Sequence, residues 1–586
     1  MQERIKIGKP SQVFREFTWS DNLVMGRFRE YLPSTLMSSG SGILLNMVDT
    51  LVVGRLIGGN ALAAVSLAAP FFVVIRMIIK MLSVGIGTNM SIYIGKNDES
   101  GMERCKRANK LIMLYGFVFI LLSQVLIGWM IMTSYSITPD ERAMVWTYMV
   151  FSMAGTPFYL VSSICNKNLQ VYGRMKSITR LTLLEQVINL VGDIVLVRFA
   201  KMGIAGAGLA TSVSQIVRAC VTFGIVIRTT DMMKTKRVSC GKEIGSILKA
   251  GLPSGQSVGQ NALQQWFLSL VMLNAVGMEG VAVKAVCSSC YNLMNIAIVA
   301  VSEAMRPVAG VMYGARDYRG GWLLLRDAMG IAFIGAALFE LLFEAFPVQT
   351  LTLYGIAQPT ARQISILQIY CSYFVLNAFI GPLQTHLTAT RQSRQAAILT
   401  ALNGVFVFAP AVLLLLALVG GHHIFWAYPI NALAAAGYGL CVVRRELNRL
   451  KAESDPANDL IVYISLRPQD GMLLSERVEE YADQMGFGRM TAMKMGIVVE
   501  ELTMAVKEKS PDARIDMILR QDQQENRLVL VSFDDGLPIR FNAEYKTGEA
   551  PDRPRMIALM SDSLRHQSIV GLNYLTMTFA LDEPRA

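Results

Sequence analysis

Residues 31–60 form an apolar stretch that constrains the fold more strongly than any other part of the chain. The stretch reads YLPSTLMSSGSGILLNMVDTLVVGRLIGGN. It is long enough to cross a bilayer as a helix, which takes about twenty residues. Its one carboxylate, Asp49, lies towards the far end. Because a charged side chain at membrane depth costs roughly 2.5–3.5 kcal/mol on insertion scales, we expect Asp49 to have a function.

The composition extends this apolar character to the whole chain. Of 586 residues, 53% are hydrophobic and 17% charged, with a mean hydropathy of +0.40, whereas soluble domains carry about 25% charged residues. We therefore expect an integral membrane protein. The polar, basic segment 1–30 lacks a cleavable signal pattern. The eight scattered cysteines and four histidines predict neither a disulfide framework nor a zinc-type site, and the net charge of +11 reflects cytoplasmic loops rather than nucleic-acid binding.

Twelve apolar runs predict an all-α membrane region with twelve transmembrane helices. The runs cover residues 31–53, 62–94, 109–132, 143–165, 178–199, 203–228, 246–275, 281–312, 323–346, 364–386, 394–418 and 423–443. Lysine and arginine gather in the even-numbered connections and after the last run. Since cytoplasmic loops carry an excess of these residues, we expect both termini on the cytoplasmic side of the cytoplasmic (inner) membrane. The predicted organisation is a cytoplasmic N-terminal segment at 1–30, six-helix bundles at 31–230 and 231–445, a linker at 446–458 and a cytoplasmic domain at 459–586.

The two halves of the membrane region repeat one another. Pro33 opens the first run and Pro253 the seventh, 220 residues later. Gly95 closes the second run and Gly314 the eighth, 219 residues later. Because each half has six crossings, the halves share one orientation, as in transporters built from parallel repeats with a site between them. The repeat therefore indicates alternating access.

Two acids in the first half point to ion coupling. Asp193 lies in the fifth run and Asn189 precedes it by four residues, so both side chains share a helix face. With Asp49 they offer oxygen ligands for a proton or Na⁺, whereas the second half has no acid at the matching positions. The alternative is a polar contact between helices that only holds the bundle together.

Several motifs, taken in order, resemble the multidrug and toxic compound extrusion (MATE) family. They are VDTLVVGRLIGG in the first run, ALAAVSLAAP and YIGKND around the second, NLVGD in the fifth and GIAGAGLATSVSQ in the sixth. The resemblance covers about residues 25–445 and implies two six-helix bundles around a central cavity, with efflux driven by Na⁺ or H⁺. Members with a cation site in the first bundle use residue types that fall here on Asp49, Asn189, Asp193 and Thr211.

Polar side chains in two runs, the second and the seventh, predict a substrate cavity. Its residues are Arg76, Lys80, Gln264 and Gln265. The two glutamines lie in the seventh run, where other members of the resembled family have a glutamate and this chain has no acid. Arg76 and Lys80 lie one turn apart in the second run, an expensive placement unless they face water or an acid. They favour a cavity for an anionic or zwitterionic substrate; the alternative is ion pairing with Glu185, Glu303 or Asp193.

After Lys451 the composition becomes that of a soluble α+β domain. We expect strands at 460–466, 514–519, 527–533 and 572–580, and helices at 473–485, 490–507 and 556–564. The order resembles the ATPase domain (GHKL type) of anti-sigma-factor kinases, histidine kinases and Hsp90, and implies nucleotide contacts at Glu500, Asp534 and Gly536. Met504 stands where the family has its Mg²⁺-binding Asn, and residues 552–556 replace the glycine-rich lid. A thioether is a poor ligand for Mg²⁺, so we expect a degenerate module without ATP hydrolysis that binds a cytoplasmic protein partner.

These features predict a cation-coupled antiporter, not an enzyme, that lies in membrane lipid and exports small organic compounds. One alternative is a flippase for lipid-linked or other anionic solutes, for which Arg76 and Lys80 are the discriminating feature. A second alternative is a membrane-tethered sensor whose tail binds a regulator, as an anti-sigma factor does. Apart from a coupling ion, H⁺ or Na⁺, no cofactor is expected.

Overall fold

The computed structural model describes most of the chain, with gaps. The described residues are 23–56, 59–96, 98–133, 139–230, 232, 234–235, 238–275, 278–315, 317–354, 356, 358–453, 464–466, 475–476, 478–479, 488–522, 527–537, 539, 553–569 and 572–580. They divide into two compact units. One comprises Tyr31–Arg445, and the other comprises Met1–Glu30 together with Glu446–Ala586.

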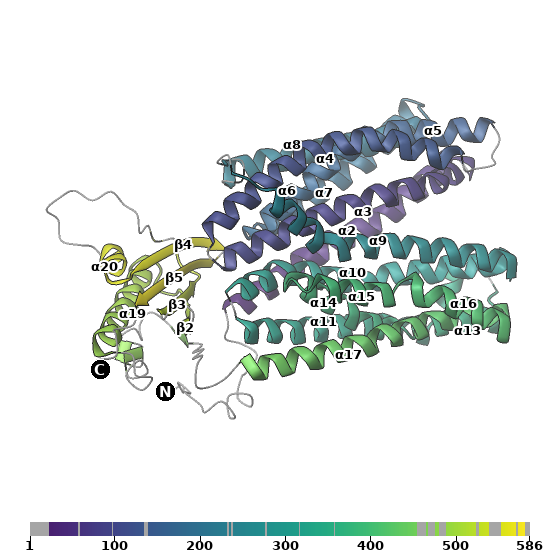
Figure 1. The fold of residues 1–586 in the computed structure, drawn as a ribbon. Helices are drawn as coiled ribbons and strands as arrows, with labels where there is room; N and C mark the ends of the chain where they lie inside the picture. Colours follow the sequence, from purple (N-terminus) through teal and green to yellow (C-terminus); the bar gives the residue numbers. More distant parts are fainter. Residues whose placement is uncertain are drawn as a thin grey trace. The chain divides into compact units, whose positions relative to one another are not determined.

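The first of these units is built from helices (Figure 1). From the N-terminus they are α2 (Leu23–Leu56), α3 (Gly59–Gly95), α4 (Glu99–Thr133), α5 (Pro139–Met153), α6 (Thr156–Val171), α7 (Met175–Asp193), the π-helix η1 (Ile194–Phe199), α8 (Ile204–Thr229), α9 (Gly241–Ala275), α10 (Met278–Gly314), α11 (Tyr318–Ala345), α12 (Pro347–Leu353), α13 (Ala361–Cys371), α14 (Phe374–Ala389), α15 (Ser393–Leu402), α16 (Val405–Leu418), the 3₁₀-helix η3 (Gly421–Trp426) and α17 (Ala427–Glu453). Within the described residues, eight helical spans are long and apolar enough to cross a membrane. A ninth is formed if α5 and α6, bent by 41°, count as one span. The predicted helical membrane region is therefore confirmed.

The helices form two bundles that meet along α3. Helices α3 to α8 pack on one another in the first bundle, and α9 packs with α14, α15 and α16, and α10 with α11, α13 and α14, in the second. Across the boundary, α3 packs on both α9 and α10. The exposed apolar side chains on the outer helices, such as Leu122 (68% exposed) and Leu418 (74% exposed), would be costly in water and suit a lipid surface.

The repeat seen in the sequence is present in the packing. A Cβ atom on Gly95 would lie 2.9 Å from Gly314 Cα, and one on Gly314 would lie 2.7 Å from Gly95 Cα. The helix breaks repeat as well. The break between α5 and α6 lies at Ala154–Gly155, and the break between α13 and α14 lies at Ser372–Tyr373. The sequence distance between these two breaks is nearly the distance between Gly95 and Gly314. The two halves are thus structural copies that contact each other at equivalent residues.

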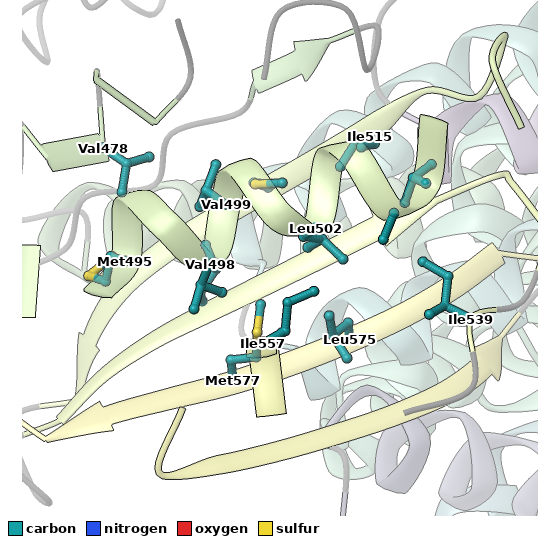
Figure 2. Close-up of a cluster of buried hydrophobic side chains, with 14 of the residues drawn as sticks. Val478, Met495, Val498, Val499, Leu502, Ile515, Ile539, Ile557, Leu575 and Met577 are labelled. Atoms are coloured by element: carbon teal, nitrogen blue, oxygen red, sulfur yellow. The ribbon is translucent and has the colours of Figure 1, made fainter. Parts of the chain in front are cut away.

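The C-terminal part of the chain forms an antiparallel sheet covered by helices. Its elements are β1 (Ile464–Leu466), α19 (Arg489–Lys509), β2 (Ile515–Asp522), β3 (Arg527–Asp534), α20 (Arg553–Met560), β4 (Ser563–Ile569) and β5 (Leu572–Ala580). The strand order is β1-β2-β3-β5-β4. Figure 2 shows α19 lying across the sheet, with side chains such as Met495, Val498 and Leu502 directed at the strands. Their spacing of three and four residues places them on one helix face.

The opposite face of this sheet is also buried. Val531, Phe533 and Tyr574 are each at most 3% exposed, and the rings of Phe533 and Tyr574 lie 4.8 Å apart. On the same face, Asp516 Oδ2 accepts a hydrogen bond of 2.6 Å from the backbone N–H of Leu23. Within this unit the start of α2 therefore contacts the second face of the sheet.

The prediction for the end of the chain was wrong in one respect. The sequence predicted a helix at 556–564, but α20 ends at Met560 and residues from Ser563 form β4, which no prediction included. β4 is polar and lies at the edge of the sheet, paired only with β5, so it lacks the apolar alternation that marks a half-buried strand. Most of the helix predicted at 473–485, and the strand before Ile464, lie outside the described residues.

Candidate functional site

A small cavity opens inside the first bundle at the break between α5 and α6. Its lining residues are Phe72, Ile75, Arg76, Ile79, Tyr148, Thr156, Tyr159, Thr211 and Gln215. The volume is about 40 Å³, enough for a few water molecules and far below the roughly 300–1,000 Å³ of a drug-sized site. In this conformation the cavity therefore fits an ion with its water rather than an organic substrate.

The helix break brings α8 close enough to line the cavity. The Gly155 N–H donates to Ser212 Oγ at 2.9 Å, which satisfies a backbone donor released by the break. A Cβ atom on Gly155 would lie 2.7 Å from Ser212 Cα and 2.6 Å from Gln215 Oε1. Only glycine fits this approach, so the sequence places a glycine where α8 meets the broken helix.

One of the predicted cation residues, Thr211, lines the cavity, and a second, Asn189, contacts Thr211. Asn189 Nδ2 donates to Thr211 Oγ1 at 3.4 Å, and Thr211 lines the cavity. Asp193 is fully buried, with 0% exposed, at the last position of α7. The chain continues directly into the π-helix η1, a rare form that is frequent at functional sites. The structure therefore brings Asn189 and Thr211 together, with buried Asp193 one turn away on α7.

Asp49 lies on α2, but its side chain is outside the described part of the structure. The described part of α2 is held against α7 by polar contacts. Ser38 Oγ donates to Thr182 Oγ1 at 3.2 Å, and Thr179 Oγ1 donates to the Ser34 carbonyl at 2.9 Å. The helix that carries Asp49 is thus bonded to the helix that carries Asn189 and Asp193.

Arg76 and Lys80 have different surroundings. Arg76 is exposed and lines the first-bundle cavity. Lys80 Nζ lies 2.9 Å from Glu303 Oε1, across the boundary between the bundles. Glu185, another candidate partner, instead forms a buried ion pair with Arg218. Ion pairing thus accounts for Lys80, whereas Arg76 faces the cavity.

Gln264 and Gln265 lie in the second bundle, away from the cavity that Arg76 lines. Gln264 Nε2 donates to the Asn403 carbonyl at 3.2 Å, where α15 gives way to α16. Gln265 Oε1 accepts from Ser288 Oγ at 3.2 Å. The four predicted cavity residues therefore lie in three places rather than one.

The bundles are closed at one end by contacts that sequence reasoning missed. This closed end is where α3 finishes, α9 begins and α10 finishes. Glu243, at the start of α9, accepts from Asn89 Nδ2 and from Tyr93 Oη of α3, each at 2.8 Å. A Cβ atom on Gly251 would collide with the Met81 carbonyl oxygen. The spacing of glycines in the sequence was the only advance signal of this close packing.

In the C-terminal domain, Asp534 and Gly536 contact each other. Burial raises the pKa of Asp534 to about 6, against the lowering effect of hydrogen bonds from Asn573 Nδ2 at 2.7 Å and the Gly536 N–H at 3.0 Å. Glu500 lies on α19, partly buried. Arg553, in the region that replaces the glycine-rich lid, pairs with Glu501 at 2.6 Å and Glu508 at 2.7 Å. This clamp fixes α20 onto α19.

No group of three or more His, Cys, Asp or Glu side chains in the described ranges is arranged to hold a metal ion.

Comparisons with known proteins place the fold. A family model described as MatE matches residues 36–195. "Multidrug export protein MepA" of Staphylococcus aureus is 23% identical over 435 residues, which are 72% of this chain and 92% of MepA. A solved structure described as "Outward-facing conformation of a multidrug resistance MATE family transporter of the MOP superfamily" superposes with a TM-score of 0.68 at 21% identity, covering 76% of this chain and all of the other.

A second solved structure, of a MOP superfamily transporter from Pyrococcus furiosus, also gives a TM-score of 0.68. It is 22% identical and covers 76% of this chain and 99% of its own. That transporter is described in the words "Reverse polarity of binding pocket suggests different function". The membrane region of this chain therefore has the fold of MATE transporters.

Proposed function

We propose that this protein is a MATE-type antiporter that exports small organic compounds across the cytoplasmic membrane in exchange for H⁺ or Na⁺. The observation that carries the proposal is the first-bundle cavity, where Thr211 contacts Asn189 one turn from buried Asp193. The shared fold and the similarity to a multidrug export protein support it. All twelve predicted helices would cross the membrane, with α2, α7 and α9 completing the nine apolar spans and both termini in the cytoplasm.

In this proposal the coupling ion acts through its different affinity for the two access states. Asp49, Asn189, Asp193 and Thr211 bind H⁺ or Na⁺. A buried carboxylate such as Asp193 is costly to keep ionised inside a membrane helix bundle, so ion binding lowers the free energy of the state in which the site is compact. A ligand shifts a conformational equilibrium only by its differential affinity for the two states, so the ion gradient drives substrate release outside.

The C-terminal domain is proposed to be a degenerate GHKL-type module that regulates the transporter by binding a cytoplasmic protein. A nucleotide in contact with Glu500, Asp534 and Gly536 would also need a lid over its phosphates, and the segment around residue 553 stands where the glycine-rich lid would be. The Arg553 clamp on Glu501 and Glu508 holds that segment against α19 instead. We therefore expect no ATP hydrolysis.

The test is ion-driven transport in proteoliposomes with an imposed Na⁺ or pH gradient and a verified fluorescent substrate. Asp49→Asn, Asp193→Asn and Thr211→Val should each abolish or reduce gradient-driven transport by at least tenfold. The matched control is Asp140→Asn, because Asp140 is an exposed acid at the start of α5 and should transport at the intact rate. Unchanged coupling in the Asp193→Asn and Asp49→Asn proteins would disprove the cation site.

A second candidate function is favoured by one observation, the exposed guanidinium of Arg76 in the cavity. It would suit an anionic or lipid-linked solute and a flippase activity, and the Pyrococcus furiosus transporter of related fold is described as having a binding pocket of reverse polarity. The variant Arg76→Gln distinguishes the flippase from the cation-coupled exporter of organic compounds. Loss of transport of anionic compounds only would favour the flippase, and substrate binding without any flux would instead favour the membrane-tethered sensor.

A further inference from the structure

A cluster of charged side chains spans the two bundles between the first-bundle cavity and the closed end. Lys80 of α3 and Lys167 of α6 both pair with Glu303 of α10. Arg306, one turn after Glu303, approaches the same carboxylate at 3.8 Å. Three cations therefore surround one anion, and the cluster carries an excess positive charge of two.

This excess charge lies deep in the protein. Lys80 precedes the end of α3 at Gly95 by about four turns, or roughly 22 Å at 1.5 Å per residue. The side chains of Lys167 and Arg306 are only 12% and 8% exposed, whereas that of Lys80 is 39% exposed, so the buried part of the excess charge belongs to Lys167 and Arg306. Buried charges are expensive unless they are paired and hydrogen-bonded, so an excess that no second acid among the described residues pairs with calls for an anionic partner.

Arg306 provides an independent indication of such a partner. Its Nε and Nη1 are buried and have no hydrogen-bond partner among the described residues. A guanidinium presents its donors as a planar fork that matches carboxylate and phosphate oxygens, and lysine ammonium groups bind the same anions as point charges. The donors therefore fit an oxyanion.

We propose that Lys80, Lys167 and Arg306 form an oxyanion-binding site for the phosphate or carboxylate group of a ligand. Glu303 is its internal occupant. Because the lysines belong to the first bundle and both Glu303 and Arg306 to the second, separation of the bundles at the closed end removes the Glu303 carboxylate from the lysines. The arriving oxyanion takes its place on the lysines and bridges them to the free donors of Arg306 in the second bundle.

Gln170 supports this assignment because it ties the cluster to the α10 backbone. Its Nε2 donates to the Glu303 carbonyl, and its Oε1 accepts from Lys167 Nζ at 3.0 Å. Lys167 is thereby positioned by a neutral group as well as by Glu303, so it stays in place when the carboxylate leaves. The site goes beyond the proposed transport function and does not depend on the coupling ion.

The experiment measures inorganic phosphate binding to the full chain by calorimetry, without an ion gradient, in neutral detergent. Lys167→Gln and Arg306→Gln should each weaken binding by tenfold or more. Glu303→Gln should strengthen it several-fold, because the internal competitor is removed. The matched control is Arg326→Gln, since Arg326 is a half-exposed arginine on α11 that pairs with Asp327, and its loss should change the affinity by less than twofold.

Nanodiscs distinguish the two sources of such an anion. Equal phosphate binding in phosphatidylcholine and phosphatidylglycerol discs would support a soluble ligand, whereas loss in phosphatidylglycerol would support a lipid headgroup at the same site. Absence of binding by the intact protein and by Glu303→Gln, both monodisperse, would overturn the proposal and leave the cluster as a structural lock. Equal weakening by Arg326→Gln would overturn it as non-specific. Failure of ion coupling at Asp49 and Asp193 leaves this measurement unaffected.

Discussion

Replacement of Asp534 by asparagine should stabilise the C-terminal domain at neutral pH. Asp534 is 4% exposed at the end of β3, and burial raises its pKa from 3.8 to about 6. Each unit of pKa difference between folded and unfolded states corresponds to about 1.36 kcal/mol. Ionised Asp534 therefore costs the folded domain about 3 kcal/mol at pH 7.5.

The sign of the pH dependence follows from proton binding. Between about pH 4 and pH 6 the folded domain keeps the proton that the unfolded chain has lost, so stability falls as the pH rises through this window. Below it both states are protonated and the cost disappears. Asparagine keeps an oxygen to accept from Asn573 and Gly536 and carries no charge. Asp534→Asn should therefore gain up to about 3 kcal/mol at pH 7.5 and almost nothing at pH 4.

Hydrogen exchange with mass spectrometry on the full chain in detergent measures this effect, with rates corrected for intrinsic pH dependence. The amides of β3 and β5 should exchange up to about a hundredfold more slowly in Asp534→Asn at pH 7.5, for a gain of about 3 kcal/mol. Asp535→Asn is the control, because Asp535 is an exposed neighbour whose carboxylate accepts from the Arg514 N–H. Equal protection of Asp534→Asn and the intact protein at pH 7.5, or a gain of the same size at pH 4, would refute the reasoning.

Two further predictions concern the membrane region. Gly251→Ala should open the closed end, because the added methyl group collides with the Met81 carbonyl oxygen and overpacking costs typically 1–3 kcal/mol. Labelling of the buried Cys240 thiol by an impermeant maleimide should then rise at least fivefold. Unchanged labelling would contradict this prediction. Arg218→Met should lower stability by about 3–5 kcal/mol, because it leaves the buried Glu185 carboxylate without its cation. The added change Glu185→Gln should restore most of the loss in a thermal unfolding assay, and a double variant as unstable as the single one would disprove the ion-pair account.

The sequence predicted the helical membrane region and its repeat well, because both depend on local patterns. Continuous apolar runs indicate helices wherever they fold. The matching positions Gly95 and Gly314 were found from spacing alone, and their contact agrees with the repeat. The breaks at Gly155 and Asn403 were missed, since apolar character continues across them and a hydropathy average does not register a local loss of helical hydrogen bonds.

The parts of the site that sequence could not predict depend on distant pairings. Lys167 follows the fourth apolar run, where lysines and arginines were attributed to a cytoplasmic connection, yet it pairs with Glu303, 136 residues away and in the other bundle. Arg76 and Lys80 were assigned a common role because they lie one turn apart, but they face different elements. In the C-terminal domain, β4 was missed because an edge strand of polar residues carries no alternation. Residues close together in sequence thus have separate partners, and residues far apart in sequence contact each other.

The contact of Gly95 with Gly314 gives the protein the geometry of a dimer fused into one chain. The neighbours of the two glycines are equivalent as well. Gly95 approaches the backbone of Val311, and Gly314 approaches the backbone of Ile92. Ile92 and Val311 are themselves 219 positions apart, as Gly95 and Gly314 are. In a two-fold dimer such a self-matching contact lies on the symmetry axis, and residue i meets j as j meets i. Both glycines lie at the closed end, where α3 and α10 finish, so this contact breaks when the bundles separate there. Bulk added to either glycine should therefore hinder closure of that end, and the two halves should be equally sensitive to it.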